Sequence, residues 1–95
     1  MALLDLLGRR WALRVVWELR ERPMTFRELQ RACGGSSSSV LNERLAELRA
    51  AGVLEAGPGG YRITEEGRGL LAIYGPLHAW AERWAARTRE SPPAP

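Results

Sequence analysis

The chain has 95 residues, which is enough for one domain with a single hydrophobic core. Its apolar share of 45% and charged share of 26% are typical of a globular protein. The sequence shows no apolar run near the ~20 residues of a membrane span and no secretory signal pattern, so we expect a cytoplasmic protein with no membrane contact. The net charge of +3 is compatible with nucleic-acid binding, and the single cysteine excludes an intramolecular disulfide or a cysteine-based metal cluster.

The first part of the chain predicts two apolar helices. Residues 1–7 (MALLDLL) predict one or two turns that must pack on something, because so short a helix is not stable alone. Residues 9–22 predict a longer helix that Pro23 stops. That helix is apolar over most of its circumference. It is therefore either a central core helix, or a helix on which Leu13 and Trp17 meet another subunit or an aromatic ligand.

A capping box opens the next predicted helix, residues 25–33. Thr25 should cap its N-terminus while the carboxylate of Glu28 reaches back to the Thr25 backbone. Cys33 falls on the apolar face of this helix, which favours a small buried side chain over a reactive thiol. Two glycines follow and supply a turn.

The stretch from Ser36 to Gly52 predicts the helix that the rest of the chain presents. Ser37 should cap it, residues 38–51 should form it, and Gly52 stands where a left-handed residue commonly ends a helix. Leucines recur at helical spacing and predict a seam that faces the core. The opposite face is small and polar, with Ser38, Ser39, Asn42, Glu43 and Ala46.

A hairpin and a long helix complete the predicted elements. Residues 53–56 and 61–64 read as short strands around a tight Gly-Pro-Gly-Gly turn. Residues 65–89 predict a helix with an apolar stripe, and Pro76 should kink it or split it into two.

The order of these elements predicts a mainly α fold with a small β-hairpin wing. This is a winged helix-turn-helix with extra N- and C-terminal helices for dimerisation. We place this domain at residues 1–90, and we expect the Pro-rich tail at residues 91–95 to be disordered.

Several short motifs occur in the order and at the spacing of a known family. They are Leu7-Gly-Arg-Arg-Trp11, Thr25-Phe-Arg-Glu-Leu29, Val40-Leu-Asn-Glu-Arg-Leu-Ala-Glu-Leu48, Gly52-Val-Leu54, Tyr61-Arg-Ile-Thr64 followed by Gly67, and Trp80. From Leu4 to about Arg87 the chain thereby resembles the HxlR-type transcriptional regulators, which are related to the MarR regulators. The resemblance implies a homodimeric bacterial DNA-binding protein, for which we expect a repressor. Its terminal helices would pack across the dimer axis, and its recognition helices would enter successive major grooves.

Three departures from the family pattern bear on function. Several HxlR-type regulators sense oxidants or electrophiles through a cysteine just before the first helix. This sequence has no thiol there, so redox sensing is not carried over. The family's wing is usually longer and basic, whereas Arg62 is the only cation of this one, which argues against a minor-groove contact. The recognition helix begins with a run of serines where the family commonly has larger residues.

DNA binding would use cations and capped helix N-termini for the phosphates, and the outer face of the recognition helix for the bases. Asn42 can bond adenine bidentately, but the short side chains around it should read few bases, so we expect modest specificity with a larger share for DNA shape. Arg44 lies near the apolar seam, where an ion pair with a nearby acid is an equal alternative to a DNA contact. The predicted DNA-binding residues are Thr25, Arg27, Arg31, Ser37, Ser38, Ser39, Asn42, Glu43, Arg44 and Arg62.

The expected partners are double-stranded DNA and a second copy of the chain. When bound to DNA, the protein would be associated with the nucleoid. The predicted dimer interface consists of Leu3, Leu4, Leu7, Trp17, Ile73, Leu77, Trp80 and Trp84. Four tryptophans also allow a small aromatic effector at that interface.

Two other classes of function were weighed against a DNA-binding regulator. An enzyme is not expected, because the sequence has one histidine, no nucleophile–base pattern and no phosphate loop. We expect neither a metal nor a cofactor. A protein-interaction or ligand-sensing module with weak or lost DNA binding is the alternative that the serine run, the short wing and the modest charge favour.

Overall fold

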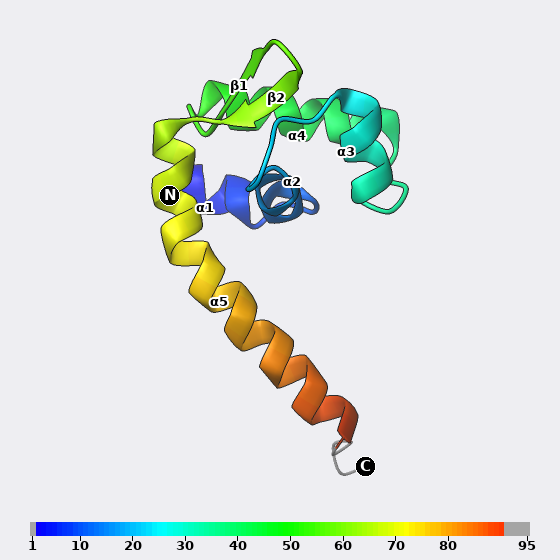
Figure 1. Ribbon diagram of the computed structural model, residues 1–95, viewed down its shortest axis with the longest axis vertical. Helices are drawn as coiled ribbons and strands as arrows, with labels where there is room; N and C mark the ends of the chain where they lie inside the picture. Colours follow the sequence, from blue (N-terminus) through cyan, green and yellow to red (C-terminus); the bar gives the residue numbers. More distant parts are fainter. Residues whose placement is uncertain (1, 91–95) are drawn as a thin grey trace.

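The hairpin and four of the helices form a head from which the last helix projects (Figure 1). The computed structural model describes residues 2–90, with side chains as far as Thr88. The tail at residues 91–95 that was expected to be disordered lies outside the described residues. The elements are α1 (Ala2–Leu7), α2 (Ala12–Glu18), α3 (Phe26–Ala32), α4 (Ser38–Ala50), β1 (Leu54–Gly57), β2 (Gly60–Ile63) and α5 (Glu65–Glu90). The predicted fold, a mainly α winged helix-turn-helix with extra terminal helices, is confirmed.

The core lies between α2, α3, α4 and the hairpin. Leu41, Leu45 and Leu48 are all at most 2% exposed, so the predicted leucine seam of α4 faces the core. The other buried apolar side chains of this cluster are Val15, Val16, Leu19, Leu29, Cys33, Val53, Leu54 and Ile63.

The predicted helix ends are confirmed at hydrogen-bond level. Thr25 Oγ1 accepts from the backbone N–H of Glu28 over 3.2 Å, and Glu28 Oε1 accepts from the backbone N–H of Thr25 over 2.9 Å. Ser37 Oγ accepts from the backbone N–H of Val40, also over 3.2 Å. Gly52 has φ 79°, a left-handed conformation that a glycine adopts without the Cβ clash.

The helix predicted at residues 9–22 is wrong in length, because α2 has only 7 residues. Trp11 adopts a left-handed φ of 76° immediately before it, which ends any helical path from Arg9. At the other end the chain leaves the helix after Leu19 so that Met24 can reach the hairpin. There Met24 exchanges two backbone hydrogen bonds with Tyr61, of 3.0 and 2.8 Å. This tertiary pairing shortens a helix that the apolar pattern alone extends to Pro23.

The wing is a hairpin with a loop of two residues, Pro58 and Gly59. Its strands pair antiparallel in a register that places Gly57 opposite Gly60. Both strands are shifted by one residue from their predicted ranges, β1 toward the C-terminus and β2 toward the N-terminus. Gly60 has φ 113°, and a Cβ atom there would overlap the backbone of Met24, so the close approach of Met24 requires a glycine.

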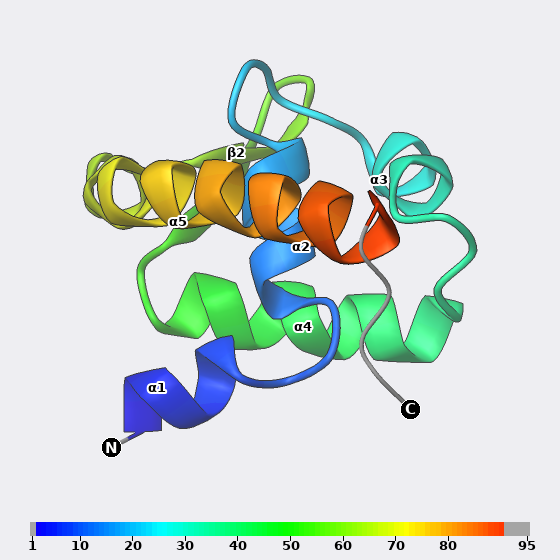
Figure 2. The ribbon, with the colours of Figure 1, turned by 90° about the horizontal axis from the view of Figure 1, so that it is seen from below.

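The helix α5 is continuous over 26 residues, so of the two alternatives predicted at Pro76, a kink or a split, the split is wrong. Gly75 precedes the proline and has no Cβ atom to clash with the ring, which removes part of the steric cost of a helical residue at that position. Ala72, whose carbonyl loses its helical donor, is exposed to water. The projection of α5 gives the molecule extents of 48 × 26 × 26 Å (Figure 1). In the view from below, α5 runs in front of α2 (Figure 2). Within residues 2–90, none of the helices combines the length and the hydropathy needed to cross a bilayer.

Candidate nucleic-acid interface

The turn between α3 and α4 is held by a side chain that the sequence did not single out. Gln30 Nε2 donates to the backbone carbonyl of Ser36 over 3.2 Å and to Ser38 Oγ over 3.1 Å. Ser36 itself is 5% exposed, and its hydroxyl has no partner among the described residues. These contacts fix the angle at which α4 leaves α3, which is the geometry that a helix-turn-helix needs to present its second helix.

The outer face of α4 is exposed as predicted. Ser39, Asn42 and Glu43 are open to solvent on the side opposite the leucine seam, and Ser38 and Ala46 are exposed with them. The hydroxyl of Ser38 is partly occupied by Gln30, whereas no hydrogen bond within residues 2–90 engages the amide of Asn42. Asn42 is therefore the side chain of this face that is most available for a base edge.

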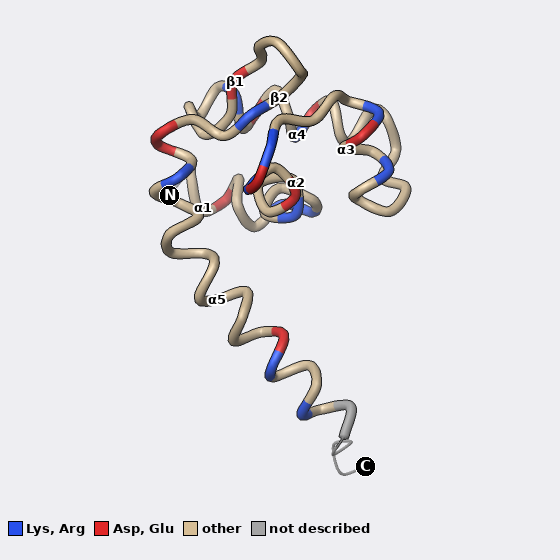
Figure 3. Tube along the Cα trace, viewed as in Figure 1, with Lys and Arg blue, Asp and Glu red and all other residues tan. Residues whose placement is uncertain are grey.

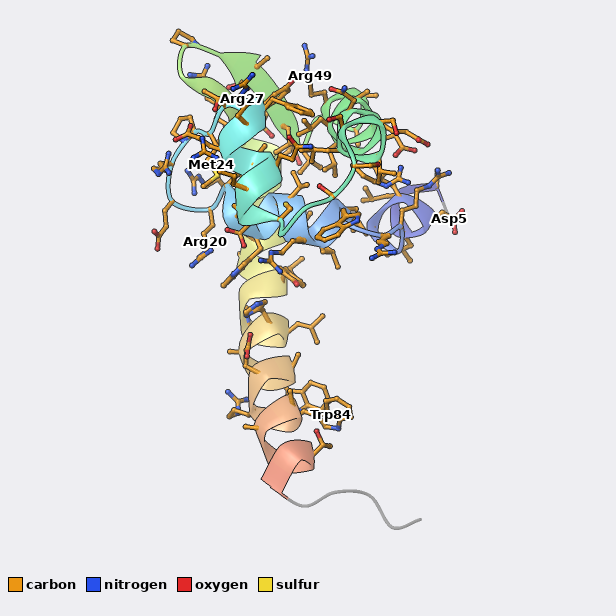
Figure 4. All side chains as sticks on the ribbon, turned by 90° about the vertical axis from the view of Figure 1, so that its right-hand side faces the viewer. Asp5, Arg20, Met24, Arg27, Arg49 and Trp84 are labelled. Atoms are coloured by element: carbon orange, nitrogen blue, oxygen red, sulfur yellow. The ribbon has the colours of Figure 1, made fainter. Side chains whose placement is uncertain are left out.

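On α3 and α4, three arginines lie exposed without an ion-pair partner among the described side chains: Arg27, Arg31 and Arg49. The first two are on α3 and were predicted. Arg49 was missed, although it follows Asn42 by two helical turns and so lies on the same side of α4. Figure 4 shows Arg27 and Arg49 near the top of the molecule, on the side from which the hairpin projects. Each of the two helices therefore carries a cation on this side of the molecule.

Two of the arginines predicted to bind DNA form ion pairs within the chain. Arg44 has a side chain only 11% exposed; it donates to the backbone carbonyl of Arg10 over 2.9 Å and forms an ion pair with Glu47. Of the two alternatives for Arg44, the structure therefore shows the intramolecular ion pair. On the wing, the Nε of Arg62 lies 2.7 Å from Glu55 Oε1. The hairpin thus presents a neutral pair rather than a free cation.

The N-terminus of α3 already holds a carboxylate. The backbone N–H of Thr25 donates to Glu28, and this hydrogen bond, with help from the Thr25 hydroxyl and from Arg22, lowers the pKa of Glu28. A carboxylate that stays ionised at this position competes with a phosphate for the same donors. Of the predicted phosphate contacts, Thr25 is thereby the one that the local structure favours least.

A second surface is apolar and lies on α1 and α5. Its side chains are between 47% and 74% exposed, and we call this set the apolar face: Leu3, Leu4, Ile73, Leu77, Trp80 and Trp84. It borders a groove of ≈ 520 Å³ between α1, α2 and α5 that Leu7 and Tyr74 also line. Figure 3 shows no charge along α5 between Arg68 and Glu82. So much apolar surface without charge is typical of a protein–protein contact.

Trp17 does not belong to this apolar face. Its ring stacks on His78 of α5, with centroids 3.9 Å apart and planes 15° from parallel. Tyr74 meets the same ring edge-on at 5.9 Å, and the guanidinium of Arg20 lies 4.0 Å from its centroid. In the described structure Trp17 makes a contact between α2 and α5 of one chain, and its place in a dimer interface stays a prediction.

The geometry above agrees with the comparisons to known proteins. A family model described as HxlR-like helix-turn-helix matches residues 6–89. The chain belongs to the HxlR-like family. YvaP, an HTH-type transcriptional regulator of Bacillus subtilis strain 168, is 33% identical over 87 residues, which cover 84% of this chain and 81% of YvaP.

Solved structures show the same arrangement in other HxlR-type proteins. The quinone-bound form of YodB from B. subtilis superposes with a TM-score of 0.77 at 32% identity, covering 86% of this chain and 93% of YodB. A possible HxlR family transcriptional factor from Thermoplasma volcanium has a TM-score of 0.83 at 24% identity, covering 88% of this chain and 82% of that one, which speaks for the fold alone. The chain is a DNA-binding transcriptional regulator of the HxlR-type winged helix-turn-helix class, and its relatives are regulators rather than enzymes.

Proposed function

We propose that this HxlR-type regulator acts as a homodimeric repressor that inserts α4 of each subunit into successive major grooves. The observation that carries the proposal is the exposed face of α4, with Asn42 and Arg49 on one side of a helix whose opposite side is buried. In a helix-turn-helix dimer the two recognition helices contact half-sites about 34 Å apart, one turn of B-DNA.

Phosphate contacts would supply most of the affinity. Arg27, Arg31 and Arg49 are free to neutralise phosphates, whereas Arg62 is paired on the wing. Base recognition would depend on Asn42, with Ser38 and Ser39 adding hydrogen bonds of little selectivity and Ala46 a methyl contact. A reader of this kind discriminates few bases directly, so the spacing of the half-sites and the shape of the DNA carry more of the specificity.

The dimer is supported by the apolar face. In a lone chain Trp80 and Trp84 are each 50% exposed, and Ile73 is 74% exposed. A domain of this size buries only about 60–65% of its unfolded surface, so covering this face would add substantially to its stability. A second copy of the chain brings an identical apolar helix, which is the self-complementary surface that a twofold dimer requires.

A small aromatic effector is a second candidate ligand. The groove beside Tyr74 and Leu77 is lined almost wholly by apolar side chains and is large enough for a one- or two-ring molecule. One relative of this chain, YodB, has a structure in a quinone-bound form. Quenching of tryptophan fluorescence on titration with simple phenols and quinones tests this second candidate.

The test of the proposed function is a mobility-shift titration on DNA fragments selected from the genome, repeated at about 50 and 200 mM salt. We expect binding to fragments whose half-sites lie one or two turns apart, and a loss of DNA affinity on the order of 100-fold or more over that salt range. Sedimentation at low micromolar concentration should show a species of twice 10.6 kDa. Failure to bind any fragment at the lower salt concentration would favour the protein-interaction module instead, and a monomer would refute the dimer.

A further inference from the structure

Apart from the packing of Leu70 and Leu71 against the core, the helix α5 is fixed to the head at two places along its length. The first is its N-terminal turn, where Thr64 Oγ1 accepts from the backbone N–H of Gly67 over 3.1 Å and Arg68 donates to the carbonyl of Arg20 over 3.0 Å. Gly67 lies so close to the carbonyl of Val53 that a Cβ atom there would overlap it. The second place is the stack of His78 on Trp17.

His78 lies eleven positions after Gly67, which is about 16 Å along a helix. Because a helix behaves as a stiff rod over such a length, two fixed points define the direction in which it leaves the head. Without the stack, the head would hold α5 only by its first turns and by the edge contact of Tyr74 with Trp17, which define the direction of the helix less sharply.

Beyond His78 the helix stands clear of the head. Residues 79–84 are all exposed, and no hydrogen bond or aromatic contact joins residues 79–88 to α1–α4 or the hairpin. Figure 1 shows this part of α5 extending well past the head, and Figure 4 shows Trp84 far from it. A small change of angle at His78 therefore becomes a large displacement at Trp80 and Trp84, which belong to the apolar face.

The stack itself is well braced. Trp17 lies on α2 next to Val15 and Val16, which are fully buried in the core and hold the helix in place. The guanidinium of Arg20 covers the indole ring, Tyr74 meets it from one turn earlier on α5, and Glu82 lies 3.6 Å from His78 Nε2 one turn later. His78 thus meets a ring that has little room to move.

We propose that His78 and Trp17 are positioning residues that set the distance between the two recognition helices of the dimer, and so determine which half-site spacing the protein accepts. This inference rests on the proposed homodimer. If α5 holds the partner, then its direction relative to the head decides where the partner's α4 lies. A regulator whose α4 reads few bases depends on this geometry for its selectivity.

The experiment compares wild type with His78→Ala, which removes the stacking ring, and with His78→Phe, which restores one. Glu82→Gln is the matched control, because it removes the neighbouring charge and keeps the stack. Each dimer is titrated against the selected operator and against versions with about 5 base pairs, half a turn of B-DNA, inserted between the half-sites. The DNA affinity of the wild-type dimer should fall on the order of 100-fold on this insertion, because only one half-site can then be engaged at a time.

We expect the DNA affinity of the His78→Ala dimer to fall only about 10-fold or less on the same insertion. The His78→Phe and Glu82→Gln dimers should behave like wild type. A second measurement needs no DNA. Spin labels at Ala46→Cys, in a Cys33→Ala background, report the separation of the two α4 helices in the free dimer. Its distribution should be narrow in wild type and in His78→Phe, and broad in His78→Ala.

The outcomes separate the inference from the function on which it rests. An equally narrow distribution and an unchanged spacing preference in a folded His78→Ala dimer would overturn the role of His78 while leaving a DNA-binding dimer intact. A wild-type protein that binds no DNA at any spacing, or that is a monomer, would instead remove the proposed function itself.

Discussion

Arg62 donates from Nε to Glu55 Oε1 over 2.7 Å, directly across the hairpin register that pairs these two residues. The only cation of the wing is therefore neutralised by its cross-strand neighbour. We predict that Glu55→Gln frees Arg62 for a phosphate, tightens DNA binding several-fold at about 100 mM salt, and steepens the dependence of log K on log salt by about 1.

The control for this prediction is Arg62→Ala. Because Arg62 is tied to Glu55 in the native wing, its loss should leave DNA affinity nearly unchanged, while the double substitution should abolish the gain of Glu55→Gln. Both side chains of the pair are about half exposed, so the free energy of unfolding should change by about 1 kcal/mol or less. A large drop in affinity for Arg62→Ala would show instead that the wing contacts DNA.

On α4, Arg49→Ala should weaken binding to all DNA sequences alike. A phosphate contact carries no base information, so the substitution should lower the salt slope by about 1 without changing the preferred operator. Asn42→Ala should differ in kind, costing about 1–3 kcal/mol at one base position and leaving the others unaffected. Arg83→Ala removes the same charge from the exposed part of α5 and serves as the control. An equal loss of affinity for Arg83→Ala would show that Arg49 acts only through the net charge of the protein.

Local signals in the sequence were sufficient for most of the helix-turn-helix. The helix boundaries are set by local contacts: a capping box at Thr25, a cap at Ser37 and a glycine at position 52. Each acts within one turn of the helix terminus at which it stands, so nearby residues alone reveal it. The outer face of α4 followed in the same way from helical periodicity, and Arg49 could have been found by extending that periodicity two turns beyond Asn42.

The features that the sequence predicted wrongly or left open share a different cause. The length of α2 depends on the pairing of Met24 with Tyr61, 37 positions later in the chain. Whether Arg44 is free depends on its contact with the Arg10 carbonyl, and whether Trp17 is covered depends on His78. Each is a contact between distant residues, and a periodicity count contains no information about which side chain will arrive there.

Truncating Trp84 tests the proposed dimer. The side chain is half exposed in a single chain, so Trp84→Ala should change the stability of the monomer little. A buried tryptophan at the centre of an interface commonly contributes 2 kcal/mol or more, which would raise the dimer dissociation constant about 30-fold. Sedimentation over a concentration series measures this. Arg87→Ala, also exposed on α5, is a control that should leave the dissociation constant within about 3-fold. An unchanged dimer in Trp84→Ala would place the interface elsewhere.

The cap of α3 should make the protein sensitive to acid. Hydrogen bonding to Thr25 lowers the pKa of Glu28 in the folded state, so this group contributes stability above its unfolded pKa and loses it as the pH falls through the folded pKa. Glu28→Gln keeps an acceptor for the Thr25 backbone but cannot titrate. Thermal melts between pH 7 and pH 3 should therefore show a smaller fall in Tm for Glu28→Gln than for wild type. Equal slopes would mean that other carboxylates dominate acid unfolding.

Cys33 should be inert in the native protein. Its side chain is 1% exposed, and burial raises the pKa of the thiol, which disfavours the thiolate that reacts with electrophiles. Labelling by iodoacetamide at neutral pH should be slow in buffer and fast in denaturant, and quinone or oxidant should not change DNA binding through this residue.

The same displacement of the Cys33 pKa has a thermodynamic consequence at alkaline pH. A folded-state pKa above the unfolded value gives stability that is complete below the unfolded pKa, about 8.5, and is lost as the pH rises through the folded pKa. Denaturant melts from pH 7 to pH 10 should then show a steeper loss for wild type than for Cys33→Ala, which has no thiol to titrate. Cys33→Ser is the more damaging change, since a buried hydroxyl without a partner costs about 1–3 kcal/mol. Rapid native labelling of Cys33 would contradict both expectations, because it would show that the thiol reaches solvent without unfolding of the α3–α4 turn.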